Sequence, residues 1–165
     1  MIIYEEVLKS FHKEKIKYVI VGGIAVNLLG SLRGTSDLDI LVEMSDENLA
    51  KIVRILKRNG YRVKQPVDPM GIADKNIRED WIKNKHMKAF NFYKEEGLKE
   101  VDIIIDTPIS YKDAQKTALR IKAGGIALPI ISIENLIKMK RITSRTVDKL
   151  DIEELKKIKK LRKDK

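Results

Sequence analysis

The sequence predicts a mixed α/β fold of the α+β class, in which a mixed β-sheet is flanked by helices and followed by a short C-terminal helical extension. Two observations lead to this prediction. Short apolar runs typical of buried strands alternate with helical patterns in the first half of the 165-residue chain. Later, two strand-like runs follow one another across a short turn, as in a β-hairpin. The alternation favours helices packed on a sheet, and the hairpin adds antiparallel pairing to that sheet.

The first elements are a helix and two buried strands. An apolar stripe at helical spacing predicts the N-terminal helix, and its members are Tyr4, Val7, Leu8 and Phe11. Residues 18–21 and 38–42 are continuous apolar runs, which are typical of strands buried on both faces. Residues 24–29 lie between them and are compatible with a helix that ends at Gly30.

The clearest helix covers residues 45–59. Ser45 is a suitable N-cap, acidic residues follow it in the first turn, and Gly60 marks the end of the helix. The apolar stripe of this helix consists of Leu49, Ile52, Val53 and Leu56. We expect a strand at residues 61–65 and a polar helix at residues 72–83 to follow.

A hairpin and a single strand are predicted in the second half of the chain. Residues 87–93 and 98–105 form the hairpin, whereas residues 114–123 fit neither a helix nor a strand clearly. Pro129 lies within the apolar run 126–131. Because proline cannot donate a hydrogen bond to a ladder, we expect this strand at an edge of the sheet.

Two helices close the chain and complete a single predicted domain. The first follows Ser132 as its cap, and the second covers residues 150–161. The length favours one domain over residues 1–165. Its core is expected at about 1–110, with the C-terminal strand and helices at about 111–165.

Composition narrows the classes of function. The chain has no cysteine, which excludes a disulfide framework, a zinc–thiolate site and a cysteine nucleophile and favours a reducing, cytoplasmic location. The longest uncharged stretch has 15 residues, at 18–32, and is too short to cross a bilayer. A net charge of +10 suggests an anionic partner. Residues 156–165 hold seven basic residues and one acidic residue, so +6 of that charge lies in the tail.

Residues 18–42 combine features that suit phosphate and metal binding. They read YVIVGGIAVNLLGSLRGTSDLDILV. Gly22 and Gly23 allow a ligand to approach the backbone, and the N-terminus of the helix that follows attracts phosphate. Asp37 and Asp39 are two residues apart on a strand, so their carboxylates leave the same face. Two adjacent carboxylates are best satisfied by a hard cation, and Mg²⁺ suits a site near substrate phosphates.

A third carboxylate is predicted on the second hairpin strand. Asp102 lies within the otherwise apolar stretch EVDIIID, and a buried carboxylate is costly unless it is paired or bound to a metal. If this strand lies beside that of Asp37 and Asp39, Asp102 either ligates a metal or takes the proton of an attacking hydroxyl. Asp106 faces the same way at the strand end and is the weaker alternative.

This combination resembles the signature of the nucleotidyltransferase superfamily, which has the DNA polymerase β-like fold. In that superfamily a Gly-Gly or Gly-Ser follows the first strand, Asp-x-Asp opens the next, and a later strand supplies a third carboxylate. Gly22-Gly23, Asp37, Asp39 and Asp102 match these positions. Gly23 departs from the usual Ser, whose hydroxyl would donate to the terminal phosphates.

The string Arg33-Gly34-Thr35-Ser36-Asp37-Leu38-Asp39 is similar to the minimal prokaryotic branch that includes AbiEii-type toxins. The C-terminal residues Lys140, Arg145, Asp148 and Asp151 are similar to that branch's Lys, Arg and Asp positions, so the resemblance covers about residues 18–155. Helical geometry places Lys140 in the middle of an apolar stripe and Lys138 on the polar side. Salt bridges without a catalytic role are the alternative for Arg145, Asp148 and Asp151.

The resemblance implies that an NMP is transferred from an NTP to an acceptor hydroxyl, with release of pyrophosphate. The triphosphate would lie at Gly22-Gly23, with Mg²⁺ or Mn²⁺ on Asp37, Asp39 and Asp102. Asp102 and Lys140 would take part in catalysis, while Arg33, Thr35 and Ser36 would donate to phosphate.

Two rival interpretations remain open at the level of sequence. The basic tail fits a nucleic-acid-binding module without catalysis, or simply a solvated helix end. The toxin-like branch fits a toxin–antitoxin component with a protein partner. RNA such as a tRNA end, a protein side chain and a small antibiotic are all compatible acceptors, and the oligomeric state is left open.

Overall fold

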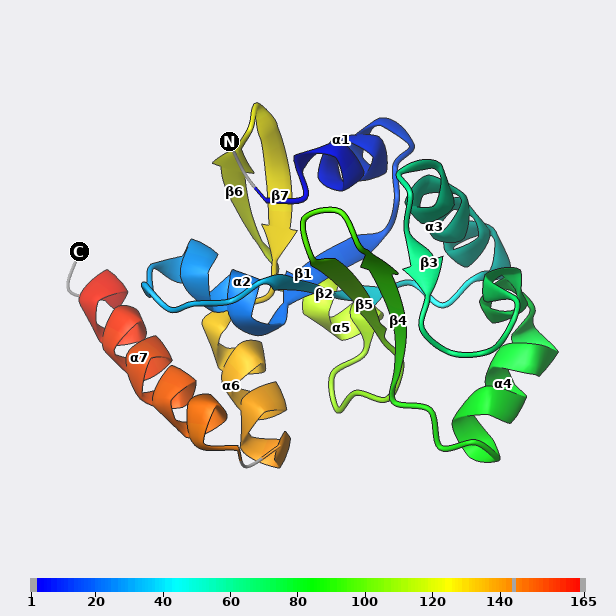
Figure 1. Cartoon of the computed structure of the whole chain (residues 1–165). Coiled ribbons are helices and arrows are strands. Elements are labelled where there is room, and N and C mark those ends of the chain that lie inside the picture. Colours follow the sequence, from blue (N-terminus) through cyan, green and yellow to red (C-terminus); the bar gives the residue numbers. More distant parts are fainter. Residues whose placement is uncertain (1–2, 144, 164–165) are drawn as a thin grey trace.

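The computed structural model describes residues 3–143 and 145–163. It contains one seven-stranded mixed sheet with the order β3-β4-β5-β2-β1-β7-β6 (Figure 1). The strands are β1 (Tyr18–Val21), β2 (Asp37–Val42), β3 (Arg62–Val63), β4 (Ala89–Lys94), β5 (Lys99–Ile104), β6 (Leu119–Ala123) and β7 (Ile126–Ile130). The helices are α1 (Glu5–Lys13), α2 (Gly22–Leu29), α3 (Asp46–Arg58), α4 (Lys75–Lys83), α5 (Tyr111–Lys116), α6 (Ile133–Thr143) and α7 (Thr146–Lys163), together with the 3₁₀ turn η1 (Pro69–Ala73).

The α+β prediction is confirmed by both kinds of strand pairing. β2 pairs with β5 in parallel, whereas β1 with β2 and β4 with β5 are antiparallel. Strand β1 and helix α3 lie where the sequence predicts them, and the Ser45 hydroxyl caps α3 by accepting a hydrogen bond from the Asn48 amide at 3.2 Å. Ser132 likewise caps α6, through the Asn135 amide at 3.2 Å.

Several element boundaries differ from the prediction. Helix α2 begins at Gly22, so both glycines belong to its first turn and do not precede it. Strand β3 is only two residues long, and the expected helix at 72–83 is divided into η1 and α4. The unassigned stretch 114–123 contains the end of α5 and all of β6, which explains its mixed pattern.

The edge position predicted for the strand at residues 126–131 is wrong. β7 lies between β1 and β6, and β6 is the edge strand. Pairing with β1 is confined to Ile130 and Ile131, beyond Pro129, where the Ile131 amide donates to the Ile20 carbonyl at 3.0 Å. The missing N–H of Pro129 therefore costs no hydrogen bond to β1.

Alternation along the central strands separates a core face from a polar face. Leu38 and Ile40 of β2 and Val101 and Ile103 of β5 are fully buried, whereas the residues between them are partly exposed. The core also takes up apolar side chains of α1 and α3, which are Val7, Leu8, Phe11, Leu49, Ile52, Val53, Ile55 and Leu56. The polar face is consequently available for chemistry.

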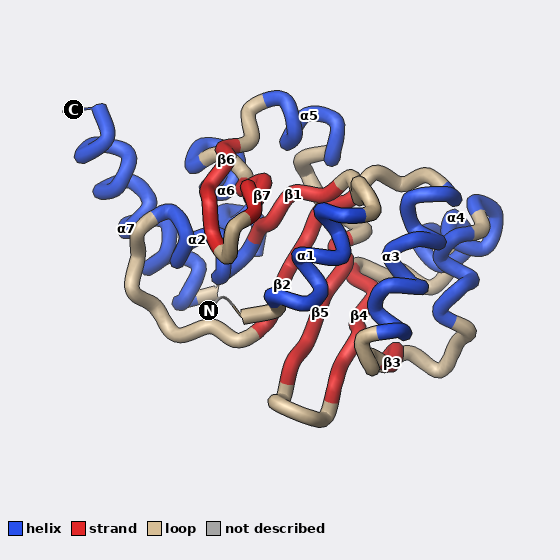
Figure 2. The backbone as a smooth tube through the Cα atoms, turned by 90° about the horizontal axis from the view of Figure 1, so that it is seen from above, coloured by secondary structure: helices blue, strands red, loops and turns tan. Residues whose placement is uncertain are grey.

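Two groups of helices lie at the two ends of the sheet. Helices α6 and α7 gather at one end, beside α2, and α3 and α4 at the other (Figures 1 and 2). In Figure 2 the β4–β5 hairpin projects beyond the neighbouring strands. None of the helices among the described residues is long and apolar enough to cross a membrane.

Asn48 joins α3 to the sheet and provides a test of the fold. Its buried amide accepts from the Lys17 amide and donates to the carbonyls of Lys17 and Glu43, each at 3.0 Å. Replacing Asn48 by Ala removes all three hydrogen bonds, and only the Lys17 carbonyl keeps a second donor, the Glu43 amide at 3.1 Å. We therefore expect a loss of about 1–3 kcal/mol in the free energy of unfolding. Urea denaturation measures this loss. Glu47→Ala, which alters an exposed residue of the same helix, serves as the control and should leave the midpoint nearly unchanged.

Candidate active site

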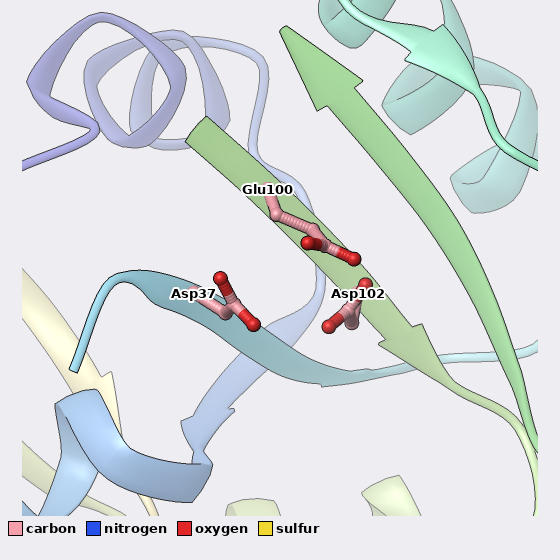
Figure 3. Close-up of side chains that lie close together, drawn as sticks. All are labelled: Asp37, Glu100 and Asp102. Carbon is pink, nitrogen blue, oxygen red and sulfur yellow. The ribbon is translucent and has the colours of Figure 1, made fainter. Parts of the chain in front are cut away.

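Parallel pairing of β2 and β5 brings the predicted carboxylates together. The register places Asp39 beside Asp102 and Asp37 beside Glu100, all on the polar face of the sheet. Figure 3 shows the carboxylates of Asp37, Glu100 and Asp102 turned toward one another from the two strands. Among the described residues, one carboxylate oxygen from each of these three lies within 4.8 Å of the others.

Glu100 is a member of this cluster that the sequence analysis missed. It lies two residues before Asp102 on the same strand, so period-2 alternation was the signal that could have identified it. Its carboxylate accepts a hydrogen bond from the Lys64 ammonium at 2.7 Å. Asp106 lies beyond the end of β5 and is exposed, so the geometry favours Asp102 as the third carboxylate.

The electrostatics of the cluster favour a bound cation. Burial and the neighbouring carboxylates of Asp102 and Asp37 together raise the pKa of Asp39 to about 8, with burial as the largest cause. Burial also raises the pKa of Asp102, although a hydrogen bond from Asn91 opposes the shift. A divalent cation would relieve this repulsion, and carboxylate oxygens are the ligands that Mg²⁺ prefers. The donor set therefore fits a hard divalent metal.

The glycine turn lies directly against these carboxylates. Gly22 has a φ of +68°, and a Cβ at this position would overlap the carboxylate of Asp39. At Gly23, a Cβ would overlap the side chains of Arg33 and Thr35. The positive φ favours glycine at position 22, whereas a larger residue at position 23 would displace the side chains of Arg33 and Thr35. The turn carries the N-terminus of α2, a suitable place for phosphate, to the edge of the acidic cluster.

Lys140 is buried, as its place in the apolar stripe predicts, and Lys138 is exposed. The Lys140 ammonium lies 2.9 Å from Asp151 Oδ2, an ion pair without hydrogen-bond geometry, and 3.5 Å from Asp148 Oδ1. Arg33 Nε lies 3.0 Å from the other oxygen of Asp151. These ion pairs connect α6, α7 and the loop before β2.

Arg145 and Asp148 extend the same network. Arg145 Nε donates to Asp148 Oδ2 at 2.9 Å, and the Thr143 hydroxyl donates to that oxygen at 2.6 Å. Burial alone would raise the pKa of Asp148, but these hydrogen bonds and the Lys140 charge bring it below its ordinary value. Asp148 is therefore held as a carboxylate, and the predicted salt bridges of this segment are present.

A cavity of about 430 Å³ lies beside Asp39 and the basic network. Its lining contains the carboxylates of Asp39 and Asp106 as well as the basic side chains of Lys140 and Arg145. Apolar side chains complete the wall, among them Ile104, Pro108, Leu136 and Met139. The volume is in the usual range for small-molecule sites. The cavity thus offers cations for phosphate and an apolar surface for a base or sugar.

The predicted phosphate donors Arg33, Thr35 and Ser36 lie in the loop before β2 and are not part of the lining of this cavity. Ser36 is exposed and donates to Asp37 Oδ1 at 3.1 Å, while its carbonyl accepts from the Tyr4 hydroxyl. Lys88, which the sequence analysis did not select, reaches the cavity from the start of β4. No sequence pattern marks Lys88, because its place depends on the pairing of β4 with β5.

Comparison with protein families gives one match over most of the chain. The model of the aminoglycoside-2''-adenylyltransferase family matches residues 4–155. The closer relationship to AbiEii-type toxins that the sequence suggested is not supported, because the matching family is a different one. No curated protein matches the chain.

Solved structures with the same fold are nucleotidyltransferases. The lincosamide antibiotic adenylyltransferase LnuA, bound to lincomycin, is 21% identical, with 92% of this chain and 93% of that chain covered and a TM-score of 0.62. ANT(2'')-Ia in complex with adenylyl-2''-tobramycin is 16% identical, with coverage of 95% and 91% and a TM-score of 0.55. A nucleotidyltransferase-like protein from Paracoccidioides brasiliensis is 17% identical, with coverage of 94% and 74% and a TM-score of 0.53.

The buried ion pairs of Asp151 predict a large effect on stability. In Asp151→Ala, Lys140 and Arg33 lose their shared partner within a buried network, so we expect the free energy of unfolding to fall by about 3 kcal/mol or more. Chemical denaturation followed by circular dichroism measures the change. Glu153→Ala removes an exposed ion pair of the same helix and should leave the unfolding midpoint almost unchanged. Equal stability of both variants would contradict a structural role for the network.

Proposed function

Because the chain belongs to the aminoglycoside-2''-adenylyltransferase family and is a nucleotidyltransferase, we propose that it transfers AMP from ATP to a hydroxyl of a small, amine-bearing antibiotic-like molecule. The observation that carries the proposal is the cavity lined by both Asp39, which would bind the metal, and Lys140, which would face phosphate. Residues 1–165 would act as one domain, since β7 pairs with β1 in the same sheet.

Asp37, Asp39 and Asp102 would hold Mg²⁺ or Mn²⁺ in this site. When bound, the metal supplies charge neutralisation at the attacking and leaving oxygens. Glu100 is a further acid beside these three residues, and its pairing with Lys64 balances its charge. The raised pKa of Asp39 supports this role, because a bound cation would stabilise the charged form of these neighbouring carboxylates.

The triphosphate would lie against Gly22-Gly23 and the N-terminus of α2. Where many members of the superfamily have a serine, this chain has Gly23, and the side chains of Arg33 and Thr35 fill the space that a Cβ would enter. The Thr35 hydroxyl and the Arg33 guanidinium would therefore replace the missing serine hydroxyl as phosphate donors. Ser36 would donate from the same loop.

Asp102 would take the proton from the acceptor hydroxyl as that oxygen attacks the α-phosphorus in line. The new P–O bond forms as the bond to the bridging oxygen of pyrophosphate breaks. Lys140 would lie near the negative charge that accumulates on the leaving pyrophosphate. Its ion pairs with Asp148 and Asp151 hold the ammonium in place before the substrate arrives.

A small cationic acceptor is favoured over RNA or a protein partner. The matched family favours a small amine-bearing acceptor, because its description names an aminoglycoside. The described part of the tail is the end of α7, and its last two residues lie outside the described residues. Lys156, Lys157 and Lys159 of this helix already pair with glutamates, which weakens the argument for nucleic-acid binding.

A cytoplasmic setting agrees with the use of ATP and the lack of cysteine.

The double variant Asp37→Asn/Asp39→Asn tests the chemistry. We expect Mg²⁺-dependent transfer of labelled AMP to fall below detection, because the amides can neither neutralise a cation nor replace the carboxylate charge. Asp113→Asn, on the exposed surface of α5, is the control and should retain full activity. Full activity in the double variant would exclude the proposed mechanism.

Parallel assays with different classes of acceptor test which substrate receives the nucleotide. The enzyme is incubated with labelled ATP, Mg²⁺ and, separately, aminoglycosides, lincosamides, total RNA and a protein lysate. We expect label on a small amine-bearing molecule, with a position on a hydroxyl established by mass spectrometry. Label on RNA or protein alone, with none on either antibiotic class, would contradict the proposed acceptor while leaving nucleotide transfer intact.

A further inference from the structure

A pair of side-chain amides lies next to Asp102 on the polar face of the sheet. Asn91 of β4 is in register with Asp102 of β5, and its Nδ2 donates to Asp102 Oδ1 at 2.6 Å. Gln65, which follows β3, reaches Asn91 from the other side, with Nε2 2.7 Å from Asn91 Oδ1. The order across the strands is therefore Gln65, Asn91, Asp102 and Asp39.

The backbone fixes the direction of these hydrogen bonds. The backbone N–H of Asn91 donates to Gln65 Oε1 at 3.2 Å, so that end of the Gln65 amide must be oxygen. Gln65 Nε2 consequently faces Asn91 Oδ1 and also donates to the Ala89 carbonyl at 3.3 Å. Asn91 can then present only its Nδ2 to Asp102. The donor character of this contact follows from the backbone, independently of how each amide is assigned.

We propose that Asn91, locked by Gln65, is a positioning residue that orients the Asp102 carboxylate for the metal ion and the acceptor hydroxyl. The inference rests on the proposed function, because it assigns a partner to a residue of that site. The hydrogen bond to Oδ1 restrains rotation of the carboxylate and so fixes the directions in which its remaining lone pairs meet a cation or the acceptor hydroxyl. Partners that orient metal ligands in this way commonly contribute 10–100-fold to metal affinity or activity.

A purely structural role for the two amides is the competing explanation. The strands they connect are already joined without them, since β3 pairs with β4 and the Lys64 amide donates to the Asn91 carbonyl at 2.8 Å. Asn91 and Gln65 are also only partly buried. Removing the side-chain amides should therefore cost little stability, and this separates the two explanations.

The test is Mn²⁺ binding, followed by electron paramagnetic resonance on the full chain without nucleotide. We expect Asn91→Ala to weaken Mn²⁺ affinity about tenfold, with an unchanged melting temperature. In Gln65→Glu, the new carboxylate accepts from Asn91 Nδ2 and turns Asn91 Oδ1 toward Asp102. We expect weaker Mn²⁺ binding here as well, although the added negative charge alone would strengthen it. The matched control is Asn84→Ala, which removes an amide–carboxylate hydrogen bond of the same length, 2.6 Å, to Asp80 in exposed α4.

Wild-type Mn²⁺ affinity in Asn91→Ala, or tighter binding in Gln65→Glu, would overturn the inference and leave the proposed function in place. Failure of the wild-type chain to bind Mn²⁺ would overturn the proposed function and this inference together. A loss in Asn91→Ala and Gln65→Glu with wild-type binding in Asn84→Ala is the result that supports it.

Discussion

The site depends on the parallel pairing of β2 with β5, which holds several carboxylates close together. Main-chain hydrogen bonds of β2 and β5 fix Asp39 beside Asp102 and Asp37 beside Glu100, while the buried residues between them anchor both strands in the core. The sheet thereby imposes a repulsion that the isolated side chains would avoid, and burial together with this repulsion raises the pKa of Asp39. A bound cation would stabilise the charged form of these carboxylates. The strand pairing that builds the sheet therefore also builds the proposed metal site.

A second set of charges balances the first from the C-terminal helices. Buried Asp148 and Asp151 hold Lys140 and reach Arg33 and Arg145, so the cations that face the cavity are fixed before any ligand enters. The same ion pairs attach α6 and α7 to the loop before β2. Stability and site geometry are therefore coupled here, because a buried ion pair is costly to break and leaves an uncompensated charge behind.

A glycine and two side-chain amides shape the surroundings of the central carboxylates. At Gly23 the side chains of Arg33 and Thr35 leave no room for the Cβ of a serine. Across the sheet, Gln65 and Asn91 form a directed pair of hydrogen bonds that ends on Asp102. Both features lie around the central carboxylates, where small changes in donor position alter how a ligand is held.

The sequence alone determined the fold class, the strand–glycine–helix turn, the Ser45 cap and the three aspartates, because each depends on local periodicity or on residues close in the chain. It also placed Lys140 on a buried stripe by helical geometry. Only the tertiary structure decided that β7 is internal, that Glu100 joins the acidic cluster, and that Lys88, Asn91 and Gln65 surround the site. These facts depend on strand order and register, which are set by pairing between distant segments. Alternation places Glu100 on the same face as Asp102, but it does not show which strand lies beside them.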